Sequence, residues 1–130
     1  MNIPALKAEL TVDPLARGYS GMTDEQAATN LNTVYRTRNK TSMTGSEVIN
    51  NVVPAEWNAL TDAHQAKAWN IVHLGTINPF GVEAMMLTAI FGAGSATIAA
   101  LAAARKDNVS RAVELGFGIV YAGNVMEARL

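Results

Sequence analysis

The stretch AMMLTAIFGAGSATIAALAAA, residues 84–104, decides the fold, because it carries no formal charge over twenty-one consecutive positions. A membrane-spanning helix needs about 20 predominantly apolar residues, so the length alone fits a span. However, nine of these positions are alanine, which adds little to membrane insertion. Gly92 to Ser95 also interrupts the run at its middle, where a glycine is typical of a helix end and a serine of the next helix start. We therefore predict two packed helices, about 82–91 and 96–107, in preference to one membrane span.

The composition limits the classes of protein to which the chain can belong. Its 130 residues predict one domain, and only 16% of them are charged, well below the usual quarter. A surface so poor in charge predicts that part of it faces other subunits. The net charge of -1 argues against a general nucleic-acid binder, and the absence of cysteine excludes disulfides and thiolate chemistry. The first residues lack the basic and apolar regions of a secretion signal, so we expect synthesis in the cytoplasm.

Most of the remaining segments begin with a recognisable helix start. Thr23 with Gln26, and Thr44 with Glu47, have the spacing of a capping box, and Thr61 precedes the longest periodic segment. We predict helices at about 4–11, 23–31, 44–53, 55–60, 62–74, 108–115 and 124–129, in addition to the two described above.

The predicted fold class is mostly α, a compact bundle of short helices. We expect at most one small two-stranded β pairing, between Val34–Arg38 and Ile119–Tyr121, since both segments have strand-like residue types. The domain prediction is a single helical domain over 1–130, with an extended arm at 33–43 and a C-terminal docking segment at 117–130.

No constellation of catalytic or metal-binding residues stands out. His64 and His73 lie nine residues apart on one predicted helix, and this spacing places them on opposite faces, so they cannot form one metal site. We expect His64 to be solvated and His73 to be half-buried in the core. The acidic residues are scattered, and no serine sits in a Gly-x-Ser-x-Gly motif. The sequence therefore predicts a protein that is not an enzyme, with no catalytic residue, no cofactor and no metal. The alternative is an enzyme whose fold brings distant acids or histidines together in one pocket.

Three cations alternate along the predicted arm, namely Arg36, Arg38 and Lys40. One interpretation is a solvated loop. The other is an arm that contacts an acidic partner or the backbone of passing DNA without sequence specificity. The methionines leave two interpretations as well, core packing or an adaptable contact surface; they are Met43, Met85, Met86 and Met126.

Two parts of the chain resemble the small structural-module proteins of tailed bacteriophages. The opening part comprises residues 6–10, 13–19, 22–24 and 31–32, and the closing part comprises residues 90–95, 109–116 and 125–129. Within that group, a helical protein of this size is similar to the head-to-tail connector adaptors, which form a ring beneath the portal and guide DNA into the tail.

The resemblance implies a non-enzymatic subunit in the neck of a virion that forms a homo-oligomeric ring and docks on the portal or stopper protein. The basic arm would face the portal, the next ring or the DNA, and Phe117, Ile119 and Tyr121 would be contact residues of the docking segment. Adaptors of this kind carry a longer C-terminal extension, whereas only residues 117–130 are present here. Capsid decoration or tail completion therefore remain alternatives, and a holin-like membrane protein is a further one.

Overall fold

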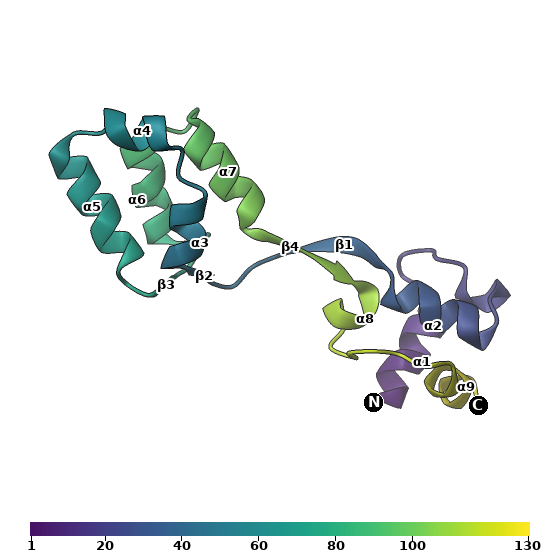
Figure 1. Cartoon of the computed structure of the whole chain (residues 1–130). Helices are drawn as coiled ribbons and strands as arrows, with labels where there is room; N and C mark the ends of the chain where they lie inside the picture. Colours follow the sequence, from purple (N-terminus) through teal and green to yellow (C-terminus); the bar gives the residue numbers. More distant parts are fainter. The chain divides into compact units, whose positions relative to one another are not determined.

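The computed structural model describes all residues from Met1 to Leu130 and is mostly α (Figure 1). Its helices are α1 (Ile3–Val12), α2 (Asp24–Asn32), α3 (Gly45–Asn50), α4 (Pro54–Ala59), α5 (Asp62–Val72), α6 (Val82–Phe91), α7 (Ala96–Ala104), α8 (Arg111–Glu114) and α9 (Ala122–Arg129), with a 3-10 turn, η1 (Tyr19–Gly21). Its strands are β1 (Val34–Asn39), β2 (Met43–Thr44), β3 (Thr76–Ile77) and β4 (Lys106–Ser110). The strands form two small sheets, β1 with β4 and β2 with β3. The predicted mostly α class is confirmed.

The chain divides into two compact units, whereas a single domain was expected from its length. Unit 1 comprises residues 1–38 and 108–130, and unit 2 comprises residues 39–107. The chain passes between the units within β1 and β4, whose residues VYRTRN and KDNVS are mostly polar or charged. Val109 is the one apolar residue that these two strands bury, and each unit has a core cluster of its own.

Unit 1 packs α1, α2, α8 and α9 around an apolar core. The core includes Leu6, Tyr19, Leu31 and Val125, none of which is exposed to solvent. The capping box of Thr23 and Gln26 is present, and Asn2 caps α1 through its side-chain oxygen. These local signals fix the starts of α1 and α2 as predicted.

The expected strand at Ile119–Tyr121 does not form, because the backbone groups of Val120 bond to the side chain of Asn32 instead of to a neighbouring strand. Asn32 Nδ2 donates to the carbonyl oxygen of Val120 at 2.7 Å, and Val120 N–H donates to Asn32 Oδ1 at 2.9 Å. Both backbone groups of Val120 are thereby satisfied without a ladder. The strand that pairs with β1 is β4, which occupies residues for which helix had been predicted. As a result α7 ends at Ala104, and α8 begins only after Ser110, which caps it.

Unit 2 packs α3 to α7 around a second core that includes Met43, Val48, Ile71 and Leu87. Strands β2 and β3 pair antiparallel, with Met43 opposite Ile77. This is a second sheet beyond the one pairing expected. Gly45 allows α3 to approach α5, since a Cβ at this position would overlap with the carbonyl oxygen of Val72.

The stretch 84–104 folds as two helices joined by a corner, as predicted. Gly92 ends α6 in a conformation with φ of 94°, which favours glycine, and Ser95 Oγ accepts from Ile98 N–H at 3.2 Å to cap α7. The carboxylate of Glu56 adds a second cap by accepting from Ala96 N–H and Thr97 N–H at 2.9 and 2.7 Å. Neither α6 nor α7, nor any other helix of this chain, has the length and apolar character that crossing a bilayer requires.

Candidate interaction surface

The three basic residues of the predicted arm, Arg36, Arg38 and Lys40, do not all lie free. Arg36 Nε donates to both carboxylate oxygens of Glu114, at 3.2 and 3.1 Å. Lys40 Nζ lies 3.2 Å from Glu47 Oε2 and 3.8 Å from Asp107 Oδ1. Arg38 is exposed. Two of the three predicted contact cations are therefore already paired with carboxylates of the chain itself.

Arg36 belongs to a network of charges inside unit 1. Arg111 donates to Glu9 from Nε and Nη2, at 2.8 and 2.9 Å, and also pairs with Glu114. Burial raises the pKa of Glu114, but the hydrogen bonds from Arg111 and Arg36 outweigh burial and leave this pKa below its usual value. Burial, with the neighbouring Tyr35 and Glu9, raises the pKa of Tyr19. Every carboxylate of this network is held by an arginine, which favours a structural role in joining α1, β1 and α8.

The C-terminal segment is divided between core and surface. Phe117 packs partly buried against the core of unit 1, whereas Ile119 and Tyr121 are 66% and 65% exposed. Helix α9 contributes Val125 and Ala128 to the same core. The segment is therefore an integral part of unit 1, and of its three predicted contact residues only Ile119 and Tyr121 lie exposed.

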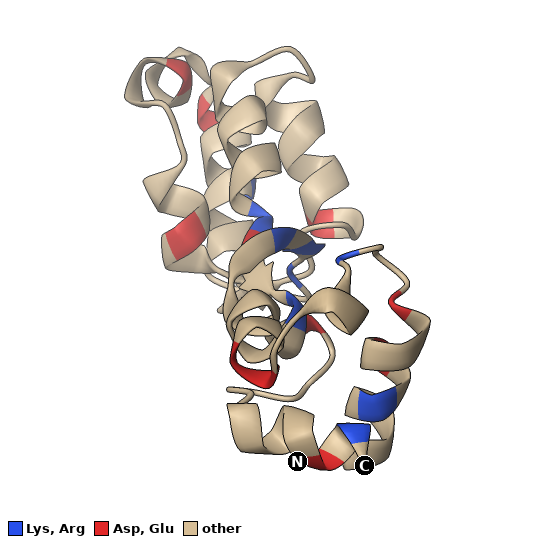
Figure 2. Cartoon of the chain, turned by 90° about the vertical axis from the view of Figure 1, so that its right-hand side faces the viewer, with Lys and Arg blue, Asp and Glu red and all other residues tan.

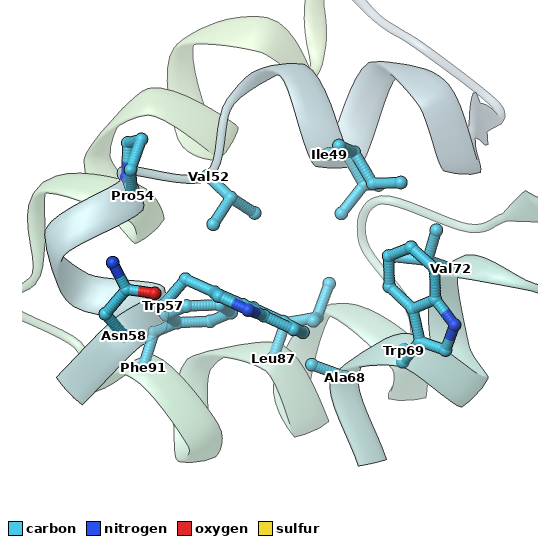
Figure 3. A pocket seen from close by; sticks show the side chains of 11 residues that line it. Ile49, Val52, Pro54, Trp57, Asn58, Ala68, Trp69, Val72, Leu87 and Phe91 are labelled. Carbon is cyan, nitrogen blue, oxygen red and sulfur yellow. The ribbon is translucent and has the colours of Figure 1, made fainter. Parts of the chain in front are cut away.

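Unit 2 carries an apolar groove between its helices (Figure 3). Its volume is about 490 Å³, and its lining includes Ile49, Val52, Trp57, Trp69 and Leu87. Ile49 and Val52 point into the groove from one side, and Trp57 and Leu87 lie on the other (Figure 3). The rings of Trp57 and Trp69 are tilted against each other with centroids 6.2 Å apart. The groove is thus an aromatic surface with almost no polar group to fix a small substrate.

Helix α5 buries Ala68 and Ile71 and leaves exposed His73, which was expected to be half-buried. Ala68 and Ile71 are buried, whereas Trp69 is 49% exposed and His73 is also exposed. His73 Nδ1 lies 2.8 Å from the carbonyl oxygen of Trp69, and the imidazole and indole rings pack in a T-shaped arrangement with centroids 4.7 Å apart. The prediction of a half-buried core histidine was therefore wrong, because the helix is rotated toward Ala68 and Ile71.

The outer face of α6 consists of large apolar side chains that lie exposed. Val82 is 67% exposed, Met85 71% and Met86 45%, and Ala89 lies on the same side of the helix. The opposite side buries Leu87 in the core of unit 2. We refer to Val82, Met85, Met86 and Ala89 as the α6 face. The sequence left two interpretations of the methionines, core packing and a contact surface; the structure buries Met43 and leaves Met85 and Met86 exposed.

Charged residues are rare in unit 2, to which α6 and α7 belong (Figure 2). Glu83 is the one charged residue of α6, and α7 has none. The missed signal in the sequence was therefore available: a helix that is apolar on all sides cannot bury every side in a unit this small. The structure contains no group of three or more histidine, cysteine or acidic residues placed to hold a metal ion.

Comparison with known proteins adds no relative to this description. No family model, no curated protein and no solved structure matches the chain.

Proposed function

We propose that this chain is a non-enzymatic structural subunit that works by self-association through the α6 face. The observation that carries the proposal is the exposure of Val82, Met85 and Met86 on a helix with a single charged residue. A helix that is apolar all round is normally buried on every side. The face that unit 2 leaves uncovered is therefore best explained by an interface.

A second copy of the chain is the partner that the chemistry of this face favours. Protein interfaces are depleted in charge at their centre and enriched in methionine and aromatic residues, as α6 and the neighbouring groove are. Two uncharged faces also meet without repulsion between like charges. The flexible side chains of Met85 and Met86 can adapt to a copy of themselves.

Within this proposal, the resemblance to phage structural modules favours a head-to-tail connector ring in the neck of a virion. The ring would contact the portal or stopper protein, for which Ile119 and Tyr121 are the exposed apolar candidates. Contact with passing DNA would fall to Arg38, because Arg36 and Lys40 are paired with Glu114 and Glu47. The exposed cation would give weak, salt-sensitive binding without sequence specificity.

Two measurements test this proposal at different levels. Sedimentation equilibrium of the purified chain tests self-association, and a strictly monomeric protein at high micromolar concentration would refute it. Mass spectrometry and a density map of intact particles test the location. Density for this fold at the neck would support the connector role. Density on the capsid surface or at the tail tip would favour decoration or tail completion, and absence from particles would refute a virion role.

A further inference from the structure

A second cavity lies inside unit 2, separate from the α6 face. It has a volume of about 240 Å³ and lies between β2, β3, α6 and α7. Most of its wall is core: Met43, Val48 and Leu87 are at most 2% exposed, and Ile77 and Leu101 complete the apolar lining. The two polar side chains in the wall are Thr88 and Arg105.

Arg105 is an unusual residue to find in such a wall. Its Nε is buried and makes no hydrogen bond. The ion pairs of unit 2 join Lys40 to Glu47 and Asp107, and do not include Arg105. Its guanidinium carbon lies 4.4 Å from the centroid of the Phe80 ring, a contact that covers the cation but accepts no N–H.

A buried donor without an acceptor is unfavourable, and nearly all such donors in folded proteins find an acceptor. Thr88 is the one other polar side chain of the wall, and it accepts no hydrogen bond from Arg105 Nε. Thr88 Oγ1 already donates to the carbonyl oxygen of Ala84 at 2.9 Å, so its remaining hydrogen-bonding capacity is that of an acceptor. The cavity therefore combines an arginine whose buried Nε lacks an acceptor with a long apolar wall.

We propose that this cavity binds a small carboxylate with a short apolar tail. The carboxylate would take a paired hydrogen bond from Nε and a terminal nitrogen of Arg105, the geometry in which guanidinium groups bind carboxylates most strongly. Since Nε is now covered, binding requires a small rotation of the Arg105 side chain. The tail would lie against Leu87, Ile77 and Leu101. This ligand site is independent of self-association.

The volume limits the size of the ligand. A cavity of about 240 Å³ equals the share of roughly eight water molecules in the liquid, at about 30 Å³ each. Hexanoate has this size. The same chemistry is also offered by a leucine at the free C-terminus of a protein chain, so a free acid and a chain terminus are the two sources to distinguish.

Nuclear magnetic resonance titration of the full chain tests the proposal directly, because the Arg105 Nε–H gives a signal of its own. We expect hexanoate at neutral pH to shift this signal and the amides of Thr88 and Leu101. Hexan-1-ol has the same tail without the charge, and we expect it to bind at least about tenfold more weakly than hexanoate. The same comparison between N-acetyl-leucine and its amide tests the second ligand source, a leucine at a free C-terminus. Tighter binding of hexanoate than of N-acetyl-leucine assigns the site to a free acid, and the reverse assigns it to a chain terminus.

Arg105→Met separates binding from folding. Because the substitution removes an unpaired donor and keeps the apolar stem, we expect a melting temperature equal to or above that of the wild type. Hexanoate should then lose its advantage over hexan-1-ol. Arg105→Lys keeps the charge but not the fork, and should retain only part of this advantage. Equal binding of hexanoate and hexan-1-ol to the wild type, or no shift of the Arg105 signal with either, would overturn the proposal.

Discussion

Met85→Lys should dissociate the proposed assembly without unfolding the subunit. Met85 is 71% exposed in the isolated chain. Fully burying a methionine side chain is worth about 1.5–3 kcal/mol, so covering its exposed part contributes about 1–2 kcal/mol per copy. If two α6 faces meet symmetrically, the loss of binding free energy is about 2–4 kcal/mol, which raises the dissociation constant roughly 30- to 700-fold. A lysine forced into the interface adds a desolvation penalty in the same direction.

Met126→Lys is the matched control, because Met126 is 57% exposed but lies on α9 in unit 1. Both substitutions replace an exposed side chain, so both should leave the free energy of unfolding within about 0.5 kcal/mol of the wild type. Sedimentation equilibrium gives the association constants, and chemical denaturation gives the stabilities. Equal weakening of association by the two variants would show that the α6 face has no special part in it.

Three further predictions concern stability. Gly45→Ala should destabilise the chain by about 3 kcal/mol, since the new Cβ would overlap with backbone atoms of Val72, whereas Gly123→Ala in open space within α9 should stabilise it by roughly 0.5 kcal/mol; urea unfolding measures both, and a neutral Gly45→Ala would contradict the close approach. The hydroxyl and N–H of Thr97 hold the pKa of Glu56 below its usual value, so Glu56 stabilises the fold above the unfolded-state pKa of about 4.3 and loses this effect as pH falls through its lower folded-state pKa. The melting temperature of Glu56→Gln should therefore be lower than that of the wild type at neutral pH and equal to it in acid. A difference in melting temperature that stays constant with pH would argue against the cap. Arg111→Met should destabilise the chain by about 3–5 kcal/mol because it leaves the charge of Glu9 buried and unpaired, and adding Glu9→Leu should recover most of the loss. Chemical denaturation measures both variants, and a double variant that is less stable than Arg111→Met would contradict this reason.

Much of the helical framework could be predicted because its signals are local. The capping box of Thr23, the caps at Thr61 and Ser95 and the break at Gly92 each act within a few residues, and α6 forms over the predicted residues 82–91. Such signals depend only on backbone groups at helix ends, which must find a partner wherever the helix lies.

The pairings between distant segments could not be predicted in this way. Asn32 takes the backbone groups of Val120 from 88 positions away, and Glu114 neutralises Arg36 from 78 positions away. No sequence pattern around Ile119 or Arg36 predicts these partners. The division into two units has the same origin, since it depends on which apolar residues meet in each core.

The orientation of α6 was hidden for a different reason. A helix with apolar residues on every side has no preferred inner face, so periodicity cannot tell Leu87, which is buried, from Met85, which is exposed. Only packing against α5 and α7 decides between them. The sequence therefore left core packing and a contact surface as two interpretations of Met85, the residue on which the proposed interface depends.

Methionine oxidation followed by mass spectrometry tests the α6 interface most directly, since hydrogen peroxide oxidises accessible methionines and the chain contains its own references. Met126 is 57% exposed in unit 1 and Met43 is 2% exposed in the core of unit 2. At low protein concentration Met85 should react about as fast as Met126, and at high concentration it should slow toward the rate of Met43 while Met126 stays fast. Oxidation of Met85 as fast as Met126 at every concentration would contradict self-association through α6.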